Sequence, residues 1–216
     1  LTEFDIKEVF FNKDYEPYAI KRDSAICELL ETNNAIPFSF KDQVIFEEKE
    51  ITKADGLPYT VYTPFKNKWL EKYKSMAPVL EYDATDVFSN FHKCDFVFPS
   101  LEQIGFEKSP IKVKPHNLKF IANYQDIRDF PALDQTSYLS PHLRFGTVSI
   151  RKLVNWAFHK NDVFLSELIW REFFMQILFS FPKVVTQNFK TAYDGIKWRN
   201  NEADFQRWCS GTTGYP

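Results

Sequence analysis

The sequence has few cysteines and few glycines, and both shortages exclude classes of protein. Its three cysteines, Cys27, Cys94 and Cys209, are far apart and form no C-x-x-C pair. Neither a disulfide framework nor a zinc site is therefore indicated. Free, scattered cysteines are typical of a reducing, intracellular compartment. Only 6 glycines and 12 prolines in 216 residues argue against a fibrous or low-complexity protein.

A long apolar run and an excess of charge of one sign are also missing. No uninterrupted apolar run approaches the roughly 18 residues of a membrane span. The first ten residues, LTEFDIKEVF, lack the pattern of a signal peptide. Lys and Arg number 27 against 29 Asp and Glu, so the net charge is −2. The overall charge gives no support to nucleic-acid binding, which would need a local basic patch.

Aromatic residues, in contrast, are abundant. They make up 18% of the chain, with 23 Phe, and hydrophobic residues make up 44%. A chain of this length is enough for one good-sized domain or two small ones. We therefore expect a substantial apolar core.

Residues 1–74 are typical of part of an α/β unit. The pattern predicts a strand at Val9–Phe11, a helix from Pro17 to about Asn33, and a second strand at Ile36–Phe40. Strand, helix and strand in this order indicate a parallel sheet. Two strands do not make a stable sheet alone, so we expect an internal piece of a longer protein with exposed apolar surface. A further helix is predicted from Pro64 through Trp69 and Tyr73.

The rest of the chain divides into a connector and an all-helical part. Residues 75–120 contain scattered prolines and little periodicity, which is typical of a segment between domains. Beyond it the pattern predicts helices, at 117–126, 141–145, 149–160, 163–181 and 201–209. The predicted domains are therefore 1–74, 75–120 as connector, and 121–216.

The helix that contains SELIWREFFMQILFSFP, residues 166–182, is apolar almost all the way round, which indicates burial. Glu167 and Arg171 nevertheless lie one turn apart, with Trp170 between them and Phe174 just below. A structural ion pair between Glu167 and Arg171 is one interpretation. The other is a cavity where a carboxylate, an indole and a guanidinium hold a planar ligand such as a base.

The segment TSYLSPHLRFG, residues 136–146, is rich in residues that begin and end helices. Ser140 is predicted to cap the helix that Pro141 opens, Gly146 to end it, and Ser149 to cap the next helix. Hydroxyls beside free amides can also hold an anion. With Thr136 and Ser137 close by, a phosphate cradle competes with a pair of ordinary caps.

Three segments in this order resemble the DNA photolyase/cryptochrome family: TSYLSPHLRFG at 136–146, SELIWREFF at 166–174 and WCSGTTGYP at 208–216. The segments NKDYEPYAIKRD at 12–23, FKDQVIFE at 40–47 and YTVYTPFKNKWL at 59–70 resemble the later half of the family's antenna domain. The resemblance covers essentially the whole chain. It implies an α/β antenna domain of doubly wound type followed by an all-α domain that holds FAD.

The resemblance also implies roles for individual residues. The Thr-Ser-x-Leu-Ser segment wraps the FAD diphosphate in the family, which assigns cofactor contacts to Thr136, Ser137, Tyr138, Leu139 and Ser140. Tyr124 stands twelve residues earlier, at the spacing of a further cofactor contact. The helix residues Glu167, Trp170, Arg171 and Phe174 would receive the damaged base pair, with Glu167 as the catalytic residue and Arg171 also touching FAD.

The implied activity is light-driven repair of cyclobutane pyrimidine dimers by a carbon–carbon lyase that uses reduced FAD. Its partner would be UV-damaged DNA, bound by a monomer without a membrane, in the cytoplasm or, in a eukaryote, the nucleus. Glu at 167 favours repair over the runner-up, a cryptochrome-like blue-light photoreceptor, and a degenerate homologue is a third interpretation. Family members with a folate antenna carry Asn-Glu where this chain has Tyr18-Ala19, which argues against folate as the second chromophore. The chain ends before the family's remaining flavin helices, so we expect the piece alone to be inactive.

Overall fold

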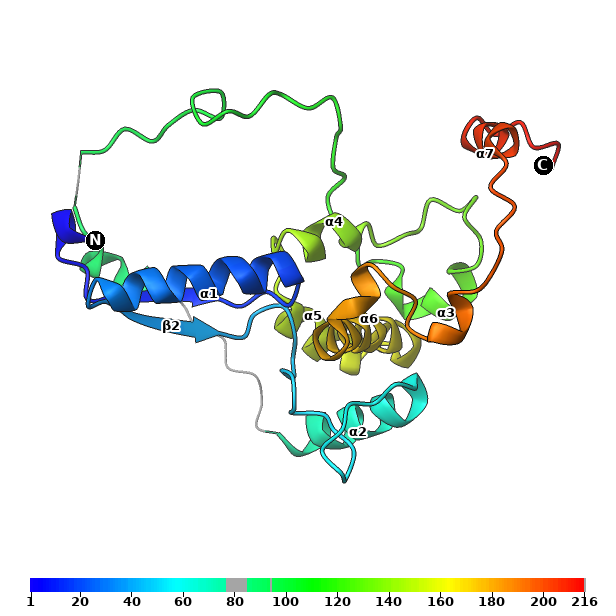
Figure 1. The fold of residues 1–216 in the computed structure, drawn as a ribbon, viewed down its shortest axis with the longest axis horizontal. Coiled ribbons are helices and arrows are strands. Elements are labelled where there is room, and N and C mark those ends of the chain that lie inside the picture. Colours follow the sequence, from blue (N-terminus) through cyan, green and yellow to red (C-terminus); the bar gives the residue numbers. More distant parts are fainter. Residues whose placement is uncertain (77–84, 94, 216) are drawn as a thin grey trace. The chain divides into compact units, whose positions relative to one another are not determined.

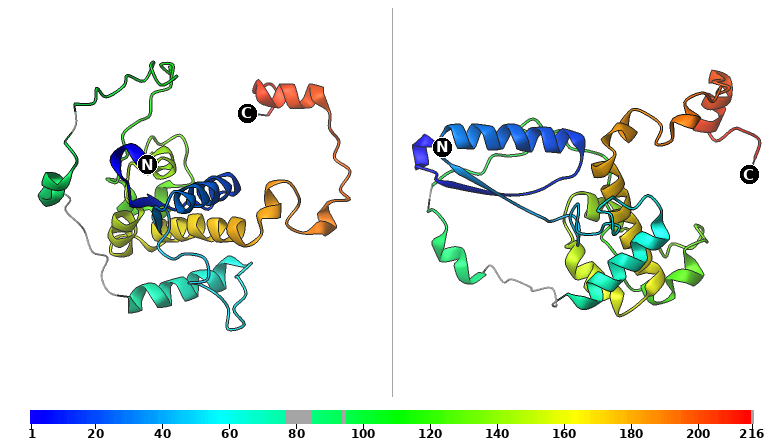
Figure 2. Two further views of the ribbon diagram at one scale, coloured as in Figure 1. Left: turned by 60° about the vertical axis from the view of Figure 1, so that its left-hand side comes forward. Right: turned by 60° about the horizontal axis from the view of Figure 1, so that its bottom comes forward.

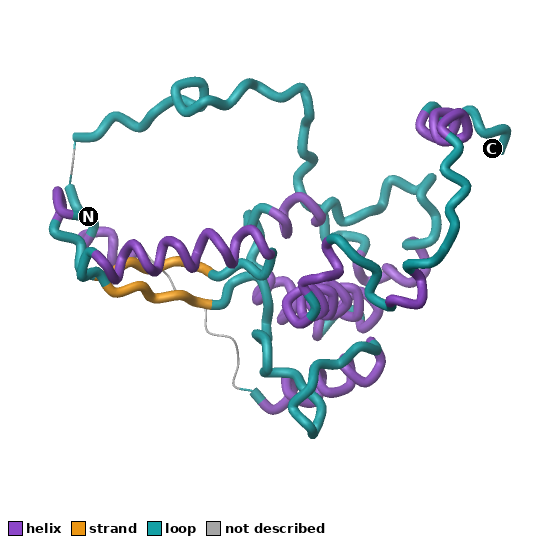
Figure 3. Tube along the Cα trace, viewed as in Figure 1, coloured by secondary structure: helices purple, strands orange, loops and turns teal. Residues whose placement is uncertain are grey.

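The computed structural model describes residues 1–76, 85–93 and 95–215 (Figure 1). Part of the predicted connector and Cys94 lie outside the described residues. The chain forms two compact units, residues 1–180 and residues 181–216. Helices and loops dominate both, and the strands lie in the first unit (Figure 3).

The first unit opens with the predicted strand, helix and strand. After a short 3-10 helix, Thr2–Phe4, strand β1 (Glu8–Asn12) leads through helix α1 (Pro17–Thr32) to strand β2 (Ile36–Phe40). The strands pair in parallel, with Glu8 opposite Ile36 and Asn12 opposite Phe40. Helix α1 covers one face of this two-stranded sheet (Figure 2). The predicted parallel arrangement is confirmed.

The other face of the sheet carries exposed aromatic rings. Phe10 stacks on Phe38 with a centroid distance of 4.9 Å and on Phe40 at 6.2 Å. Phe10 is 61% exposed and Phe40 is 51% exposed. The expectation of exposed apolar surface beside the sheet is confirmed.

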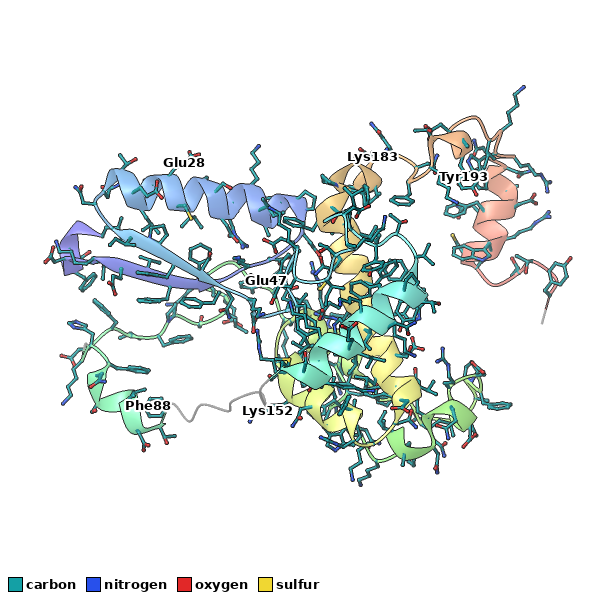
Figure 4. All side chains as sticks on the ribbon, turned by 90° about the horizontal axis from the view of Figure 1, so that it is seen from below. Glu28, Glu47, Phe88, Lys152, Lys183 and Tyr193 are labelled. Atoms are coloured by element: carbon teal, nitrogen blue, oxygen red, sulfur yellow. The ribbon has the colours of Figure 1, made fainter. Side chains whose placement is uncertain are left out.

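The main core lies between helices α2 (Tyr62–Ser75), α5 (Ile150–Phe158) and α6 (Asp162–Ser180). Helix α2 begins two residues before the predicted Pro64. It turns Phe65, Trp69 and Tyr73 inward, since these positions fall on one helix face. Ala157 and Ile169, from the two later helices, are fully buried in the same core. Figure 4 shows the side chains of these helices densely interleaved.

The stretch before α5 contains less helix than its sequence predicts. Residues 95–116 are exposed and form neither helix nor strand. The predicted helix 117–126 is wrong at its start. The side chain of Asn117 accepts a hydrogen bond from the amide of Lys119, and the amide of Asn117 donates to the carbonyl of Ser137, so the chain does not enter a helix there. A 3-10 turn (Ile121–Asn123) and the short helix α3 (Tyr124–Ile127) form instead. A 3-10 helix, Thr85–Asn90, is the other element between α2 and α3 in the described residues.

The prediction that Ser140 caps a helix is wrong, because helix α4 (Leu139–Arg144) already includes Ser140. Its N-cap is Tyr138, in the left-handed conformation with φ 53°, and Pro141 is the third helical residue. Leu139 is buried, so the helix starts where that side chain enters the core. The predicted end is confirmed, because Gly146 has φ 66° and the amide of Thr147 bonds the carbonyl of His142.

The predicted cap of α5 is also confirmed. The hydroxyl of Ser149 accepts a hydrogen bond from the amide of Lys152.

The second unit, residues 181–216, is small and mostly irregular. It contains two 3-10 turns (Pro182–Val185 and Thr191–Tyr193) and helix α7 (Glu202–Cys209). Asn201 caps α7 by accepting from the amide of Asp204. Phe205 and Trp208 stack on its exposed side, so this unit buries little apolar surface of its own.

Candidate functional site

A cavity of about 410 Å³ lies in the first unit, beside one face of α6. Helices α3 and α4 and the loop after β2 complete its wall. Its lining residues are Gln43, Tyr124, Ser137, Leu139, Ser140, Leu143, Arg144, Phe164, Glu167, Leu168, Arg171 and Met175. Six of these are residues that the sequence predicted for the site: Tyr124, Ser137, Leu139, Ser140, Glu167 and Arg171. A lining that combines apolar side chains with a few polar and charged ones is typical of a small-molecule site.

The segment Thr136–Ser140 contributes only part of its residues to this cavity. Ser137, Leu139 and Ser140 line it, whereas Thr136 and Tyr138 do not. The hydroxyl of Tyr138 lies 2.8 Å from the ammonium of Lys114 and also contacts Asp134. Helix α4 has only six residues, and the cationic side chains that line the cavity are Arg144 and Arg171.

Glu167 stands at the edge of the cavity and pairs with Arg128. The distance from Nη1 of Arg128 to Oε1 of Glu167 is 2.5 Å, and both side chains are 35% exposed. The ion pair between Glu167 and Arg171 that one interpretation expected does not form. Arg171 instead donates to the carbonyl of Gln43 at 2.6 Å. The carboxylate therefore remains accessible from the cavity, with a cation holding its other side.

Arg171 is half-buried in the cavity wall. Burial lowers the pKa of its guanidinium, while the charges of Glu172 and Asp42 act in the opposite direction. The adjoining cavity, of about 440 Å³, shares Arg171 with the first. Gln43, Leu143 and Arg144 also line both cavities, so the two cavities adjoin at Arg171.

Trp170 and Phe174 lie outside this lining, contrary to the expectation of one shared cavity. Trp170 stacks on Tyr62 of α2, with a centroid distance of 3.5 Å and an interplanar angle of 8°. The hydroxyl of Tyr62 donates a hydrogen bond to the carbonyl oxygen of Ser166 at 2.8 Å, which helps to hold the ring. Phe174 also stacks on Trp170, at a centroid distance of 5.4 Å, and is 60% exposed. The two rings form an aromatic stack on a neighbouring face of α6.

Sequence reasoning missed Glu172, the only buried charged or polar side chain among the described residues. Its carboxylate accepts from the amide of Ile45 at 2.7 Å, the amide of Phe46 at 3.1 Å and the indole of Trp69 at 2.7 Å. Burial raises the pKa of Glu172 to about 7, although the three donors act against it. A signal existed in the sequence, because a carboxylate within an otherwise apolar helix needs partners.

Gln43, Arg128 and Arg144 were missed as well. Arg144 belongs to the motif TSYLSPHLRFG and was available to sequence reasoning. It pairs with Glu16 at 2.5 Å on the surface. Gln43 and Arg128 are distant in sequence from the residues that they contact, so no local pattern pointed to them.

A separate cavity of about 450 Å³ extends from the carboxyl ends of β1 and β2 along α1 as far as Glu31. Tyr15, Ser39 and Cys27 are among its lining residues, together with Phe179 from the end of α6. Burial, with Glu47 nearby, raises the pKa of Tyr15. Ligands of open α/β sheets bind at this end of the strands.

Comparison with known proteins agrees with this geometry. The family model "DNA photolyase" matches residues 1–92, and "FAD binding domain of DNA photolyase" matches residues 164–216. The chain belongs to the DNA photolyase/cryptochrome family. FAD is the cofactor that the second match assigns to this family.

Two curated relatives are deoxyribodipyrimidine photo-lyases. The protein of Halobacterium salinarum is 32% identical over all of this chain and 50% of its own length. The protein of a Synechococcus species is 29% identical over 99% of this chain and 50% of its own length. The chain therefore spans about half the length of these members of the family.

Solved structures give the same family. An archaeal photolyase from Sulfolobus tokodaii, described with two FAD molecules, is 30% identical, with a TM-score of 0.69 over 98% of this chain and 48% of its own. A cryptochrome of Synechocystis is 18% identical with a TM-score of 0.66 over all of this chain and 50% of its own. The latter shares the fold. Among the described residues, no helix is both long and apolar enough to cross a membrane.

Proposed function

We propose that the chain is part of a photolyase that uses light and FAD to repair cyclobutane pyrimidine dimers in DNA. The observation that carries the proposal is the 410 Å³ cavity, which gathers six sequence-predicted site residues beside α6. The family relatives that are named deoxyribodipyrimidine photo-lyases support it. The repair activity belongs to the whole protein, of which this chain supplies the cavity wall described above.

The residues present fit a flavin nucleotide. Arg144 and Arg171 provide positive charge, and the hydroxyls of Ser137 and Ser140 provide hydrogen bonds suited to a diphosphate. Tyr124 and Leu139 offer apolar surface to the planar part. We propose that Thr136 and Tyr138 act on the cofactor through their backbone, because their side chains lie outside the cavity lining.

Reduced FAD, when bound and excited by light, supplies the electron for splitting the pyrimidine dimer. In this proposal the residues of this chain bind FAD, orient the pyrimidine dimer and stabilise the charge that develops on it. We propose that Glu167 acts on the dimer, since its carboxylate stands at the cavity edge. Hydrogen bonding at the place where charge develops is the largest contribution a side chain makes to such a step.

The aromatic stack of Trp170 and Phe174 is the proposed platform for the damaged bases. An exposed ring such as Phe174 offers a face on which an unstacked base can rest. A pyrimidine dimer is poorly stacked in DNA, so turning it out of the duplex costs less than turning out a normal base. In this proposal Trp170 needs Tyr62 behind it to keep its plane fixed.

The test compares Glu167→Ala with Arg128→Ala in the whole protein of which this chain is part, loaded with FAD and reduced. Loss of one hydrogen bond to developing charge costs about 3 kcal/mol, or roughly a hundredfold in rate. We expect that loss of repair on dimer-containing oligonucleotides for Glu167→Ala, with flavin content unchanged. Arg128→Ala should retain most of the repair. Equal repair by wild type and Glu167→Ala would contradict the proposed role of Glu167, and absence of repair by wild type would favour the cryptochrome-like photoreceptor.

The second chromophore, the domain bounds and the oligomeric state are also proposals. We propose that the 450 Å³ cavity beside β1 and β2 holds a second chromophore other than folate. We propose domains at 1–74 and 121–216 with 75–120 as connector, and a monomer acting on DNA inside the cell. Size-exclusion chromatography with light scattering would test the oligomeric state.

A further inference from the structure

The loop of residues 41–46, which follows β2, is hydrogen-bonded to the helices through side chains of α5 and α6. Arg151 of α5 donates to the carbonyls of Lys41 at 2.7 Å and Asp42 at 3.0 Å. On α6, Arg171 donates to the carbonyl of Gln43 at 2.6 Å, and Gln176 donates to the carbonyl of Phe46 at 2.9 Å. More than one hundred residues of sequence separate the partners of each bond. The conformation of the loop therefore depends on contacts with α5 and α6, which are distant in sequence.

Glu172 is the centre of this attachment. It holds the amides of Ile45 and Phe46, and the indole of Trp69 secures the same carboxylate from α2. The side chain is 2% exposed, so water cannot replace a lost partner. Charge-assisted hydrogen bonds are stronger than neutral ones, and this buried carboxylate takes two adjacent amides of the loop at once.

Gln43 and Arg171 connect this attachment to the 410 Å³ cavity beside α6, which is called the cofactor cavity below. Gln43 lies two positions before Ile45 and lines the cavity, and so does Arg171. Arg171 donates a hydrogen bond to the carbonyl of Gln43 and directly precedes Glu172 in α6. The charge of Glu172 also favours the charged form of Arg171, against the effect of burial. Glu172 thus acts on Arg171 twice, through the loop and through its charge.

We propose that Glu172 is a positioning residue of the cofactor cavity, which fixes the guanidinium of Arg171 and the backbone at Gln43. The identity of the cofactor rests on the proposed function, but the positioning of Arg171 does not. Glu172 touches no ligand in this proposal. It works through the 41–46 loop and through its charge.

The first test measures Arg171 directly, without flavin. Wild type, Glu172→Gln and Gln176→Leu are treated with phenylglyoxal at pH 8, and the modification of Arg171 is followed by peptide mass spectrometry. Glu172→Gln keeps the shape but loses the charge and one acceptor, so we expect Arg171 to react about tenfold faster. Gln176→Leu, the matched control, loosens the same loop at Phe46 without changing the charge. Its rate should stay within about twofold of wild type.

The second test is the FAD affinity of the whole protein of which this chain is part, measured by flavin fluorescence. We expect about tenfold weaker binding for Glu172→Gln and little change for Gln176→Leu at comparable thermal stability. Equal Arg171 reactivity in wild type and Glu172→Gln would overturn the proposal. Equal increases in both variants would also overturn it, because a general loosening of the loop, without the bond to Ile45 or the charge of Glu172, would then explain the effect. If wild type bound no FAD, the proposed function would fail while the labelling result would still decide the role of Glu172.

A further variant guards against misfolding. Should Glu172→Gln lose the far-ultraviolet circular dichroism of the native protein, Glu172→Asp takes its place in both tests. The shorter carboxylate keeps the charge but cannot reach both loop amides at once. We expect intermediate reactivity of Arg171, and reactivity equal to wild type would count against the loop as the means of positioning.

Discussion

The helical core and the sheet layer of the first unit use their aromatic residues in opposite ways. In the core, Phe65 and Trp69 of α2 are each 1% exposed, packed between rings of neighbouring elements. On the sheet, Phe10 and Phe40 stack on each other but remain more than half exposed. The same residue types thus contribute burial in one region and an open apolar face in the other.

The difference shows where the stability of this chain resides. The hydrophobic contribution scales with the apolar area removed from water, and the core of α2, α5 and α6 removes most of the area of its rings. That core is also where the 41–46 loop is attached and where the proposed cofactor cavity lies. An exposed apolar face contributes little to folding and is a typical place for further protein contacts.

The largest expected effect separates these two regions directly. Trp69→Ala should lower the free energy of unfolding by about 3–5 kcal/mol, because it removes a fully buried ring and leaves a cavity. Phe10→Ala, the matched change on the open face, should cost less than about 1 kcal/mol. Urea denaturation followed by circular dichroism measures both. Similar losses in the two variants would show that the sheet face is buried in solution.

The pH dependence of stability sharpens the comparison within the core. Burial raises the pKa of Glu172 to about 7, so the native state binds this proton more tightly than the unfolded state does. Its stabilising contribution is complete below the ordinary pKa of about 4.5 and is lost as the pH rises through 7. The free energy of unfolding of wild type relative to Glu172→Gln should therefore fall between pH 4.5 and pH 8.

Glu50 provides a control of opposite sign. Burial opposes the ionisation of Glu50, but hydrogen bonds from Lys41 and the amide of Glu47 outweigh it and lower its pKa. Its contribution should be present above its ordinary pKa and lost as the pH falls. Denaturation of wild type and Glu50→Gln from about pH 5 downward measures this. Slopes of equal sign for the two variants would contradict the assignment.

The aromatic stack should respond to a smaller change. Tyr62→Phe keeps the ring against Trp170 but removes the hydroxyl that contacts Ser166. We expect a loss of about 1 kcal/mol in the free energy of unfolding. The tryptophan fluorescence spectrum should barely change. A large spectral shift would mean that the hydroxyl, rather than the ring, keeps Trp170 in place.

The smallest effects distinguish a true helix cap from a wrongly predicted one. Ser149→Ala should cost about 1 kcal/mol, because the hydroxyl caps α5. Ser140→Ala should stay within about 0.5 kcal/mol, since Ser140 lies inside α4 rather than before it. Chemical denaturation of both variants checks this. Equal losses would restore Ser140 as a cap.

Local pattern predicted most elements of the fold. The strands around Val9 and Phe38 and the helices at α1, α2, α5, α6 and α7 appear close to their predicted bounds. Alternation, helical periodicity and caps depend on residues a few positions apart, which a sequence displays directly. The same locality explains the failures at 117–126 and at Ser140, where a bond to Ser137 and the burial of Leu139 set the backbone.

The sequence by itself determined the family motifs, the order of elements and six residues of the proposed cofactor cavity. Only the tertiary structure decided which partners these residues take. Glu167 pairs with Arg128 rather than Arg171, Trp170 stacks on Tyr62, and Glu172 holds a loop 126 residues away. The physical reason is that a buried carboxylate or ring takes the donors and surfaces that packing brings to it. Those neighbours come from distant parts of the chain, and no local spacing specifies them.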